Sequence, residues 1–299
     1  MEGVKSRAGR KHFAVSRFVI GFFILLFSLV CLLPMVLTFM VSITDESTIM
    51  RYGYSFFPKK FSGYAYRLMF QGGSNVLQSY GISILVTVVG TLAAVVITGL
   101  CAYTLANKNV KYRNALALFI FIPMVFTAGI VPWYLICTWL HLRNNLAALI
   151  VPNLLFNPFN MYLVRNFMEG VPDSLRESAT IDGANDAVIA FRIYFPLCMP
   201  ALATVGLFYG LAYWNDWWNA IMLVDDQSLY PIQYFLLQLK SRISMLRDLQ
   251  YLSGSGSLTP PTESLKMATA IVTVGPIVLL YPFLQKYYVK GLVIGSVKG

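Results

Sequence analysis

The chain has 299 residues, of which 57% are hydrophobic and only 12% are charged, and its mean hydropathy is +0.64. A soluble domain usually has about 25% charged residues, so this chain has too few polar side chains to cover a water-soluble globule. Its net charge of +10 does not indicate a nucleic-acid-binding protein, because the basic residues form no dense block. In membrane proteins such residues more often set the orientation of the chain.

Six runs without Asp, Glu, Lys or Arg follow one another along the chain. Crossing a bilayer takes about 20 apolar helical residues. A charge at mid-membrane costs about 2.5 to 3.5 kcal/mol on insertion scales. We therefore predict an all-α integral membrane protein with six transmembrane helices, the first kept as an anchor and the fifth extending to about Leu223. The runs are residues 18–44, 81–107, 114–140, 144–164, 193–215 and 267–285.

The basic residues orient these six helices. With the N-terminus inside, 14 of the 23 lysines and arginines lie on inner segments, three of them in the short turn at 107–114. Both termini are therefore predicted to be cytoplasmic. The expected parts are an inner tail (1–17) and a six-helix membrane domain (18–288), followed by a second inner tail (289–299). The membrane domain includes two outer loops (45–80 and 224–266) and one inner loop (169–196).

The fourth run carries a set of asparagines, Asn153, Asn157 and Asn160. Spacings of four and three residues would place them on one helix face, although Pro152 and Pro158 interrupt the run. A polar stripe in a membrane must face protein or a water-filled path. Pore lining and packing against a partner both stay open.

The inner loop at 169–196 carries the signals of a helix–turn–helix along the membrane surface. Ser174 and Glu177 match the spacing of a capping box, which predicts a helix start. Gly183 can adopt the left-handed conformation that ends a helix. A second short helix is expected at about 185–192. The physics alone leaves a docking role and a simple connector open, although loops this long are often functional.

The fifth run ends in aromatic and polar residues, Trp214, Asn215, Asp216, Trp217 and Asn219. An ionisable group within a span predicts a functional site. Sugars suit this set, since their ring faces stack on indoles and their hydroxyls bond to Asn and Asp. An outer aromatic belt with hydrogen bonds between helices is the alternative. The four cysteines lie inside apolar runs without metal-ligand spacing and are predicted to be small buried hydrophobic residues.

Two stretches resemble a known family. Glu177-Ser178-Ala179, Gly183, Ile193 and Phe195-Pro196 resemble the E-A-A-x3-G-x9-I-x-L-P loop of ABC importer permeases, with Ser178 and Phe195 as departures. Residues 290–299 resemble the K-G-L-x-x-G-A-V-K-G tail of the carbohydrate branch, the second permease of maltose-type and complex-oligosaccharide importers. The resemblance covers nearly the whole chain. It implies an ATPase-coupling set of Glu177, Ser178, Ala179, Asp182, Gly183, Ala184, Ile193 and Pro196, and an ATPase-interface tail with Lys290, Gly291, Gly295 and Lys298.

The resemblance implies a type I ABC importer permease fold and a non-enzymatic transport subunit in a bacterial cell membrane. It would form half of the path for an oligosaccharide brought by an extracellular solute-binding protein, beside a second permease and an ATPase pair that uses ATP and Mg. The chain itself is expected to bind no cofactor and no metal, and it has no G-x-x-x-x-G-K-[ST] phosphate loop. A permease for a peptide or amino acid is the alternative. An integral-membrane enzyme or sensor would need paired carboxylates or a His/Cys cluster, which the spans lack.

Overall fold

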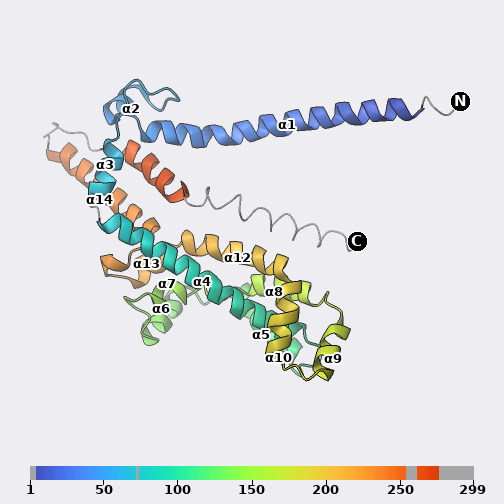
Figure 1. Ribbon diagram of the computed structural model, residues 1–299. Helices are drawn as coiled ribbons and strands as arrows, with labels where there is room; N and C mark the ends of the chain where they lie inside the picture. The colour runs from blue at the N-terminus through green and yellow to red at the C-terminus, as the bar shows by residue number, and fades with distance from the viewer. Residues whose placement is uncertain (1–4, 72–73, 254–260, 276–299) are drawn as a thin grey trace. The chain divides into compact units, whose positions relative to one another are not determined.

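The computed structural model describes residues 5–71, 74–253 and 261–275. These residues form helices joined by loops, and one isolated antiparallel bridge, between Thr44 and Phe61, is the strand-like pairing among them (Figure 1). The prediction of an all-α protein is therefore confirmed. The chain divides into two units, Met1–Gln71 with Leu239–Gly275, and Gly72–Gln238 with Pro276–Gly299. Each unit is described by itself.

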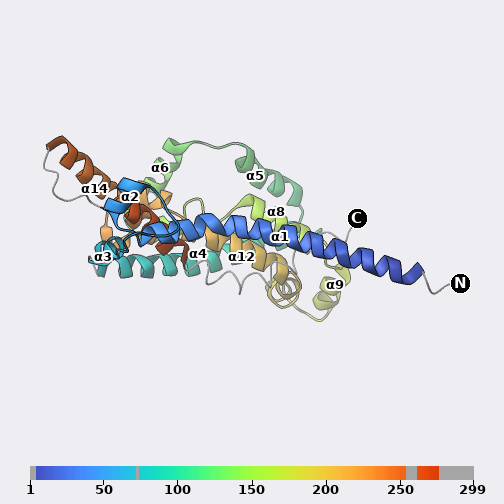
Figure 2. The ribbon, with the colours of Figure 1, turned by 90° about the horizontal axis from the view of Figure 1, so that it is seen from above.

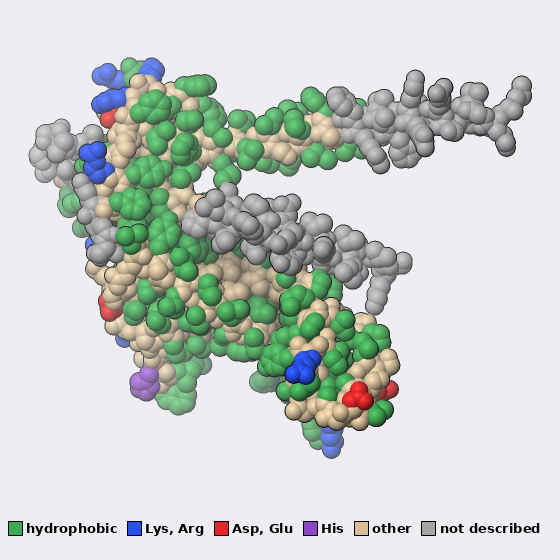
Figure 3. Space-filling model, in the orientation of Figure 1, with side chains coloured by type: hydrophobic (Ala, Val, Ile, Leu, Met, Phe, Trp, Pro, Cys, Tyr) green, Lys and Arg blue, Asp and Glu red, His purple; other side chains and the backbone are tan. Residues whose placement is uncertain are grey.

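The first unit begins with the long helix α1 (Lys5–Ser42). Its segment Val19–Ser42 has a mean hydropathy of 2.8, enough in length and composition to cross a membrane, and the visible face carries hydrophobic and no charged side chains (Figure 3). The hydroxyl groups of Ser28 and Thr38 each donate to the carbonyl four residues earlier at 2.8 Å. These two hydroxyls are thus paired within the helix, as a lipid environment demands.

A carboxylate joins the two chain segments of the first unit. The loop after α1 contains α2 (Glu46–Tyr52) and α3 (Tyr64–Gln71). The buried Glu46 carboxylate accepts hydrogen bonds from the backbone N–H groups of Thr262, Glu263 and Ser264 at 2.9–3.1 Å, and from the hydroxyls of Thr262 and Ser264. These groups begin a helical segment at residues 263–275. A negative charge at a helix N-terminus satisfies amides that the helix cannot pair internally.

The second unit is built on the pair α4 (Ser74–Ala106) and α12 (Met199–Trp214), which lie side by side in both views (Figures 1 and 2). Glycines allow their close approach. A Cβ added at Gly90 would lie 2.5 Å from the Tyr213 ring, and one at Gly99 would lie 2.6 Å from the Phe195 ring. Small residues let helix backbones approach closely in membranes.

Two tyrosines of α12 hold the interrupted fourth run. That run contains α7 (Ala147–Ile150) and α8 (Pro158–Met168), separated by non-helical residues. Tyr209 Oη shares a hydrogen bond with Thr98 Oγ1 of α4 at 2.7 Å and accepts the Asn157 N–H at 2.9 Å. Tyr213 Oη donates to the Ile150 carbonyl at 2.8 Å. Backbone groups released by the break are thereby paired within the unit.

The third run, expected as one helix, is also broken. It forms α5 (Arg113–Val125) and α6 (Ile130–Trp139), which meet at 118° and form the two arms of an arch in Figure 2. Residues 126–129 are not helical, and Gly129 has a φ of +83°. The prediction of a continuous helix over 114–140 is therefore wrong: α5 ends before Phe126, whose backbone is extended, and α6 begins only after Gly129, whose positive φ does not fit a helix.

The fifth run bends where its N-terminal part meets α12. Short segments α10 (Asp186–Ile189), η1 (Ala190–Tyr194) and α11 (Phe195–Leu197) lead into α12 at an angle of 85°. From the end of α12 to residue 253 the chain forms α13 (Trp218–Leu223), η2 (Gln227–Leu229) and α14 (Ile232–Ser253).

Length and apolarity identify two straight candidate spans among the described residues, Val19–Ser42 and Val76–Ala106, and up to four if each bent pair is one span. The sixth run extends past residue 275, outside the described residues. Six membrane crossings therefore stay a prediction. Of the four cysteines, Cys137 and Cys198 are buried as predicted, but Cys31 is exposed and Cys101 half-buried, since an apolar run can face outward as well as inward.

Candidate functional site

The inner loop folds as a helix–turn–helix, as predicted. Its first helix, α9, spans Asp173–Ile181 and follows Pro172, whose φ of −59° and ψ of 131° place it just outside the helix. The expected capping box is wrong. Ser174 lies within the first turn, and Pro172 at the N-cap position offers no side-chain hydrogen bond. Proline fixes its own φ, so the helix begins two residues earlier than a capping box at Ser174 indicated.

The end of α9 confirms the role predicted for Gly183, which has a φ of +82°. Its N–H donates to the Thr180 carbonyl at 3.1 Å, and the Ala184 N–H donates to the Ala179 carbonyl at 2.9 Å. This pair of bonds is the Schellman arrangement that closes a helix with a left-handed residue. Asn185 then caps α10 by accepting the Val188 N–H at 2.9 Å. The turn between the two helices is therefore fixed by its own hydrogen bonds.

One side of α9 is open to solvent. Ile181, at the end of the helix, is 86% exposed. Glu177, Ser178 and Asp182 are also exposed, and Ala179 is half-buried. The lobe containing this loop carries acidic and basic side chains in Figure 3. An exposed isoleucine beside two carboxylates is suited to insertion into a cleft with an apolar floor and a basic rim.

The opposite side of α9 is fixed to the end of α4 by residues that the sequence did not single out. The Arg176 guanidinium, on a residue only 8% exposed, donates to the Asn107 side-chain oxygen. Lys108 Nζ contacts the Asp173 carboxylate at 2.6 Å, and this hydrogen bond lowers the pKa of Asp173. No local signal marks Arg176, since arginine in a short amphipathic helix is most often a surface residue.

A second contact holds the start of α10 to the same helix. Tyr103 Oη donates to the Asp186 carboxylate at 3.0 Å, and the Tyr103 ring packs edge-on against Tyr194 with centroids 5.0 Å apart. Both tyrosines are buried. The two helices of the loop are thus attached to one short stretch, residues 103–108, which contains the end of α4 and the two residues after it.

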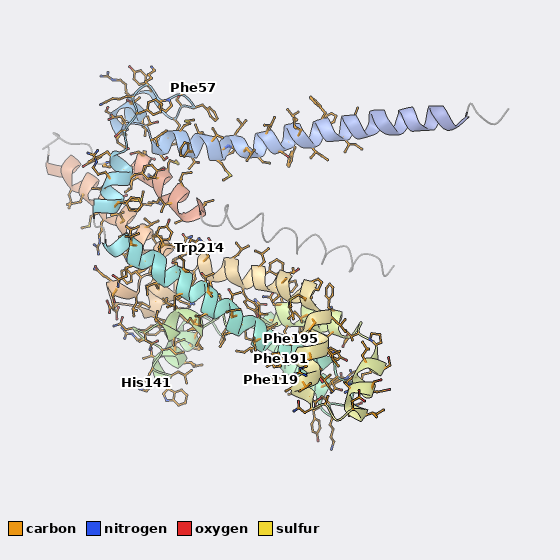
Figure 4. All side chains as sticks on the ribbon, in the orientation of Figure 1. Phe57, Phe119, His141, Phe191, Phe195 and Trp214 are labelled. Carbon is orange, nitrogen blue, oxygen red and sulfur yellow. The ribbon has the colours of Figure 1, made fainter. Side chains whose placement is uncertain are left out.

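The motif residues beyond the turn lie where the chain bends into α12. Ile193 is half-buried, and Pro196 is exposed within α11. Between them, Phe195 packs against Phe191 with ring centroids 4.9 Å apart (Figure 4) and fills the space that Gly99 leaves. The structure therefore places the predicted coupling residues on one continuous segment that ends against the α4–α12 pair.

The predicted substrate-path residues at the end of α12 divide into two groups. Asn215 and Trp217 are exposed, and Gln233 donates to the Asn215 side-chain oxygen at 3.2 Å. Trp214, labelled in Figure 4, is buried at the last position of α12. Asn219 is also buried, and its amide donates to the Pro152 carbonyl at 3.1 Å.

Asp216 occupies the break between α12 and α13. Its Oδ1 accepts the N–H groups of Trp218 and Asn219 at 3.1 and 3.2 Å. Asp216 Oδ2 and the Asn219 side-chain oxygen are buried and have no hydrogen-bond partner among the described residues. The fifth helix, predicted to run to about Leu223, is therefore interrupted after Trp214. Its continuation is α13, and Asp216 caps the start of that helix.

The prediction that the three asparagines of the fourth run share one helix face is wrong. Asn153 has a φ of +63° and lies in the break, and Asn157 is the N-cap of α8, accepting the Asn160 N–H at 3.2 Å. Only Asn160 lies within a helix, and it is buried. The cause is Pro158, which disfavours helical backbone at the residue before it. The tail residues Lys290, Gly291, Gly295 and Lys298 lie outside the described residues.

Comparisons with known proteins agree with this arrangement. A family model described as "Binding-protein-dependent transport system inner membrane component" matches residues 95–294. The polygalacturonan/rhamnogalacturonan transport system permease protein YtcP of Bacillus subtilis is 37% identical over 277 residues, covering 93% of this chain and 96% of that protein. Protein LplC of the same organism is 37% identical, with 90% of each chain covered.

A solved structure is also similar along nearly the whole chain. It is the crystal structure of a bacterial ABC transporter involved in the import of the acidic polysaccharide alginate. The matched chain superposes with a TM-score of 0.76 at 28% identity, covering 94% of this chain and 98% of that one.

Proposed function

The chain belongs to the family of binding-protein-dependent transport system inner membrane components, and we propose that this permease of a sugar or polysaccharide ABC importer forms half of the path for an oligosaccharide. A second, homologous permease supplies the other half. An extracellular solute-binding protein delivers the substrate. Both termini lie on the cytoplasmic side of a bacterial cell membrane, with α9 and α10 on that side as well.

The observation that carries the coupling role is the two-sided character of α9. Its exposed side presents Ile181, Glu177 and Asp182, while its opposite side is fixed to the end of α4 through Arg176. Because Ile181 is 86% exposed, its apolar side chain is available for contact with another subunit. We propose that this exposed side of α9 binds in a cleft on a separate ATPase subunit.

ATP hydrolysis belongs to a pair of separate subunits, since this sequence contains no phosphate-binding loop. When the pair closes on ATP, each docked α9 is displaced, and the membrane helices attached to it change between inward-facing and outward-facing arrangements. The C-terminal tail, with Lys290 and Lys298, is assigned to the interface of the same pair. ATP and Mg bind to those subunits and not to this chain.

Oligosaccharides are the substrates to test first. The relatives are described as permeases for polygalacturonan/rhamnogalacturonan and for arabinooligosaccharides. The exposed Trp217 and Asn215 offer an aromatic face and an amide of the kind that sugar rings and hydroxyls require. Within this class the proposal does not depend on one sugar or linkage.

Site-directed cross-linking tests the docking of α9. A cysteine placed at Ile181 is expected to cross-link to an ATPase subunit in the assembled complex, since this position is 86% exposed. A cysteine at His141 is the control, because that residue is also exposed but lies beyond α6, away from the lobe of Phe191 and Phe195 (Figure 4). Equal cross-linking from both positions, or none from Ile181, would contradict the docking role.

A second experiment tests the substrate class. The complex is reconstituted in liposomes with its solute-binding protein, and ATP hydrolysis is measured with galacturonate oligomers, arabino-oligosaccharides or short peptides. Stimulation by one of the sugars and not by peptides is the expected result. Stimulation by peptides alone would overturn the proposed substrate class and leave the coupling role intact.

A further inference from the structure

Arg176 is the one buried residue of α9, whose other side chains are exposed or half-buried. A surface helix of a globular unit is normally held by an apolar stripe. In α9 the half-buried Ala179 buries only a small apolar side chain, which is too little to form such a stripe. The attachment of α9 therefore depends on one directional polar contact, the guanidinium of Arg176 on the side chain of Asn107.

The acceptor is held in place before it meets the arginine. Asn107 directly follows α4, and its side-chain oxygen also accepts the Asn109 N–H at 2.9 Å, which fixes the rotamer as in an Asx turn. Its own N–H donates to the Tyr103 carbonyl at 3.1 Å. The carboxyl end of a helix of 33 residues carries partial negative charge, which favours a cation at this point.

The neighbouring contacts are weaker restraints. The Lys108–Asp173 pair has both side chains largely in solvent, at 64% and 46% exposure, and such pairs contribute little. The contact between Tyr103 and Asp186 restrains α10 and not α9. Removal of the buried guanidinium should therefore release α9 while leaving the second helix of the loop attached.

The helix that receives this contact is itself rigidly packed. Gly90 and Gly99 allow α4 to touch the aromatic rings of Tyr213 and Phe195, and Thr98 is hydrogen-bonded to Tyr209. A displacement applied at residue 107 is thus applied to the α4–α12 pair together. The chain connection from α9 to α12, by contrast, passes through a turn, a π-helical stretch and a bend of 85°.

We propose that Arg176 is the positioning residue through which movement of α9 is transmitted to the carboxyl end of α4. This inference rests on the proposed coupling function. Without the guanidinium, α9 still binds the ATPase subunit, but α4 no longer follows it. A hydrogen bond to a buried charged group changes an equilibrium by about tenfold or more, so the detached arrangement should become populated to that degree.

The test uses the full chain assembled with its partner permease and ATPase pair in liposomes. Spin labels are attached to cysteines at Ser174 on α9 and Leu92 on α4, both exposed positions, after the four native cysteines are replaced by alanine. Pulsed electron paramagnetic resonance gives the distance distribution between the labels without nucleotide and with ATP and vanadate. The native arginine should give one unchanged, narrow distribution in both states.

Arg176→Met keeps a long apolar side chain and removes the charge, and its distribution should broaden or shift when nucleotide binds. Asn107→Leu should reproduce this result from the other side of the contact, and Arg176→Lys should retain part of the native behaviour. Arg192→Met is the matched control, because that arginine lies in the same loop but is exposed, and it should behave as the native chain does.

Three results would overturn the proposal. One is a distribution in Arg176→Met that matches the native one in both nucleotide states, and another is a native distribution that itself changes with nucleotide. The third is loss of cross-linking from Ile181→Cys in the Arg176→Met background, which would make the arginine a folding or docking residue. Failure of the proposed function is recognised separately, as absence of that cross-link in the native background.

Discussion

Replacement of Gly183 tests why the turn after α9 requires glycine. The reason is either the left-handed backbone conformation or the absence of a side chain that would touch a partner. The residue has a φ of +82°, and a Cβ added there would meet nothing within 4 Å. In this chain alone, a substitution therefore carries a backbone cost without a steric one. For an L-residue with a Cβ the left-handed region costs about 1–2 kcal/mol, and asparagine costs less because it visits this region more readily.

Proline is the severe case. Its ring holds φ near −65°, which cannot match the native turn. It also removes the N–H that donates to the Thr180 carbonyl at 3.1 Å. The expected cost is about 3 kcal/mol or more. For alanine, a cost of about 1–2 kcal/mol corresponds to a factor of about 5–30 in the population of the native turn.

The assay is recovery of the ATPase subunits when the chain is purified from membranes, with the amount of chain in the membrane measured in parallel. Insertion should be unchanged in every variant, because the hydrophobic runs are untouched. Recovery should fall in the order glycine, asparagine, alanine, proline. Equal loss with asparagine, alanine and proline would refute the conformational argument and indicate direct contact between Gly183 and the partner. Normal recovery of the proline variant would count against docking by this loop.

Three further substitutions test other parts of the structure. Gly99→Ala places a Cβ 2.6 Å from an aromatic ring and should cost about 1–3 kcal/mol by overpacking, lowering the thermal midpoint, whereas Gly81→Ala meets nothing within 4 Å and should not. Glu46→Ala leaves several buried donors unpaired and should lower the midpoint by more than substitution of a residue with one contact. The pKa of Asp173 is lowered by the hydrogen bond from Lys108, so its contribution is full above the unfolded pKa of about 3.9 and is lost as pH falls through the lowered folded value. Asp173→Asn should lack that acid-dependent part in a pH series of thermal midpoints, and an identical pH profile would contradict the pairing.

Several features of the site follow from neighbouring residues and could be predicted from the sequence. The length of the apolar runs indicates lipid as the solvent, because a chain with so few charged residues cannot cover its surface with polar side chains. The left-handed Gly183 and the cap at Asn185 are local as well, since each involves hydrogen bonds over only a few residues. Pro158 marks a helix start by the same short-range effect.

Contacts between distant residues decided the rest. Arg176 and Asn107 are separated by 69 positions, and Glu46 and Thr262 by 216. Nothing in the sequence around either member identifies its partner, because a polar group is paired or exposed according to which helix packs against it. Local chemistry thus determined the helices, their ends and the solvent they face. Tertiary packing determined which buried polar groups meet, and in the second unit Gly90 and Gly99 admit the aromatic rings against which α4 packs.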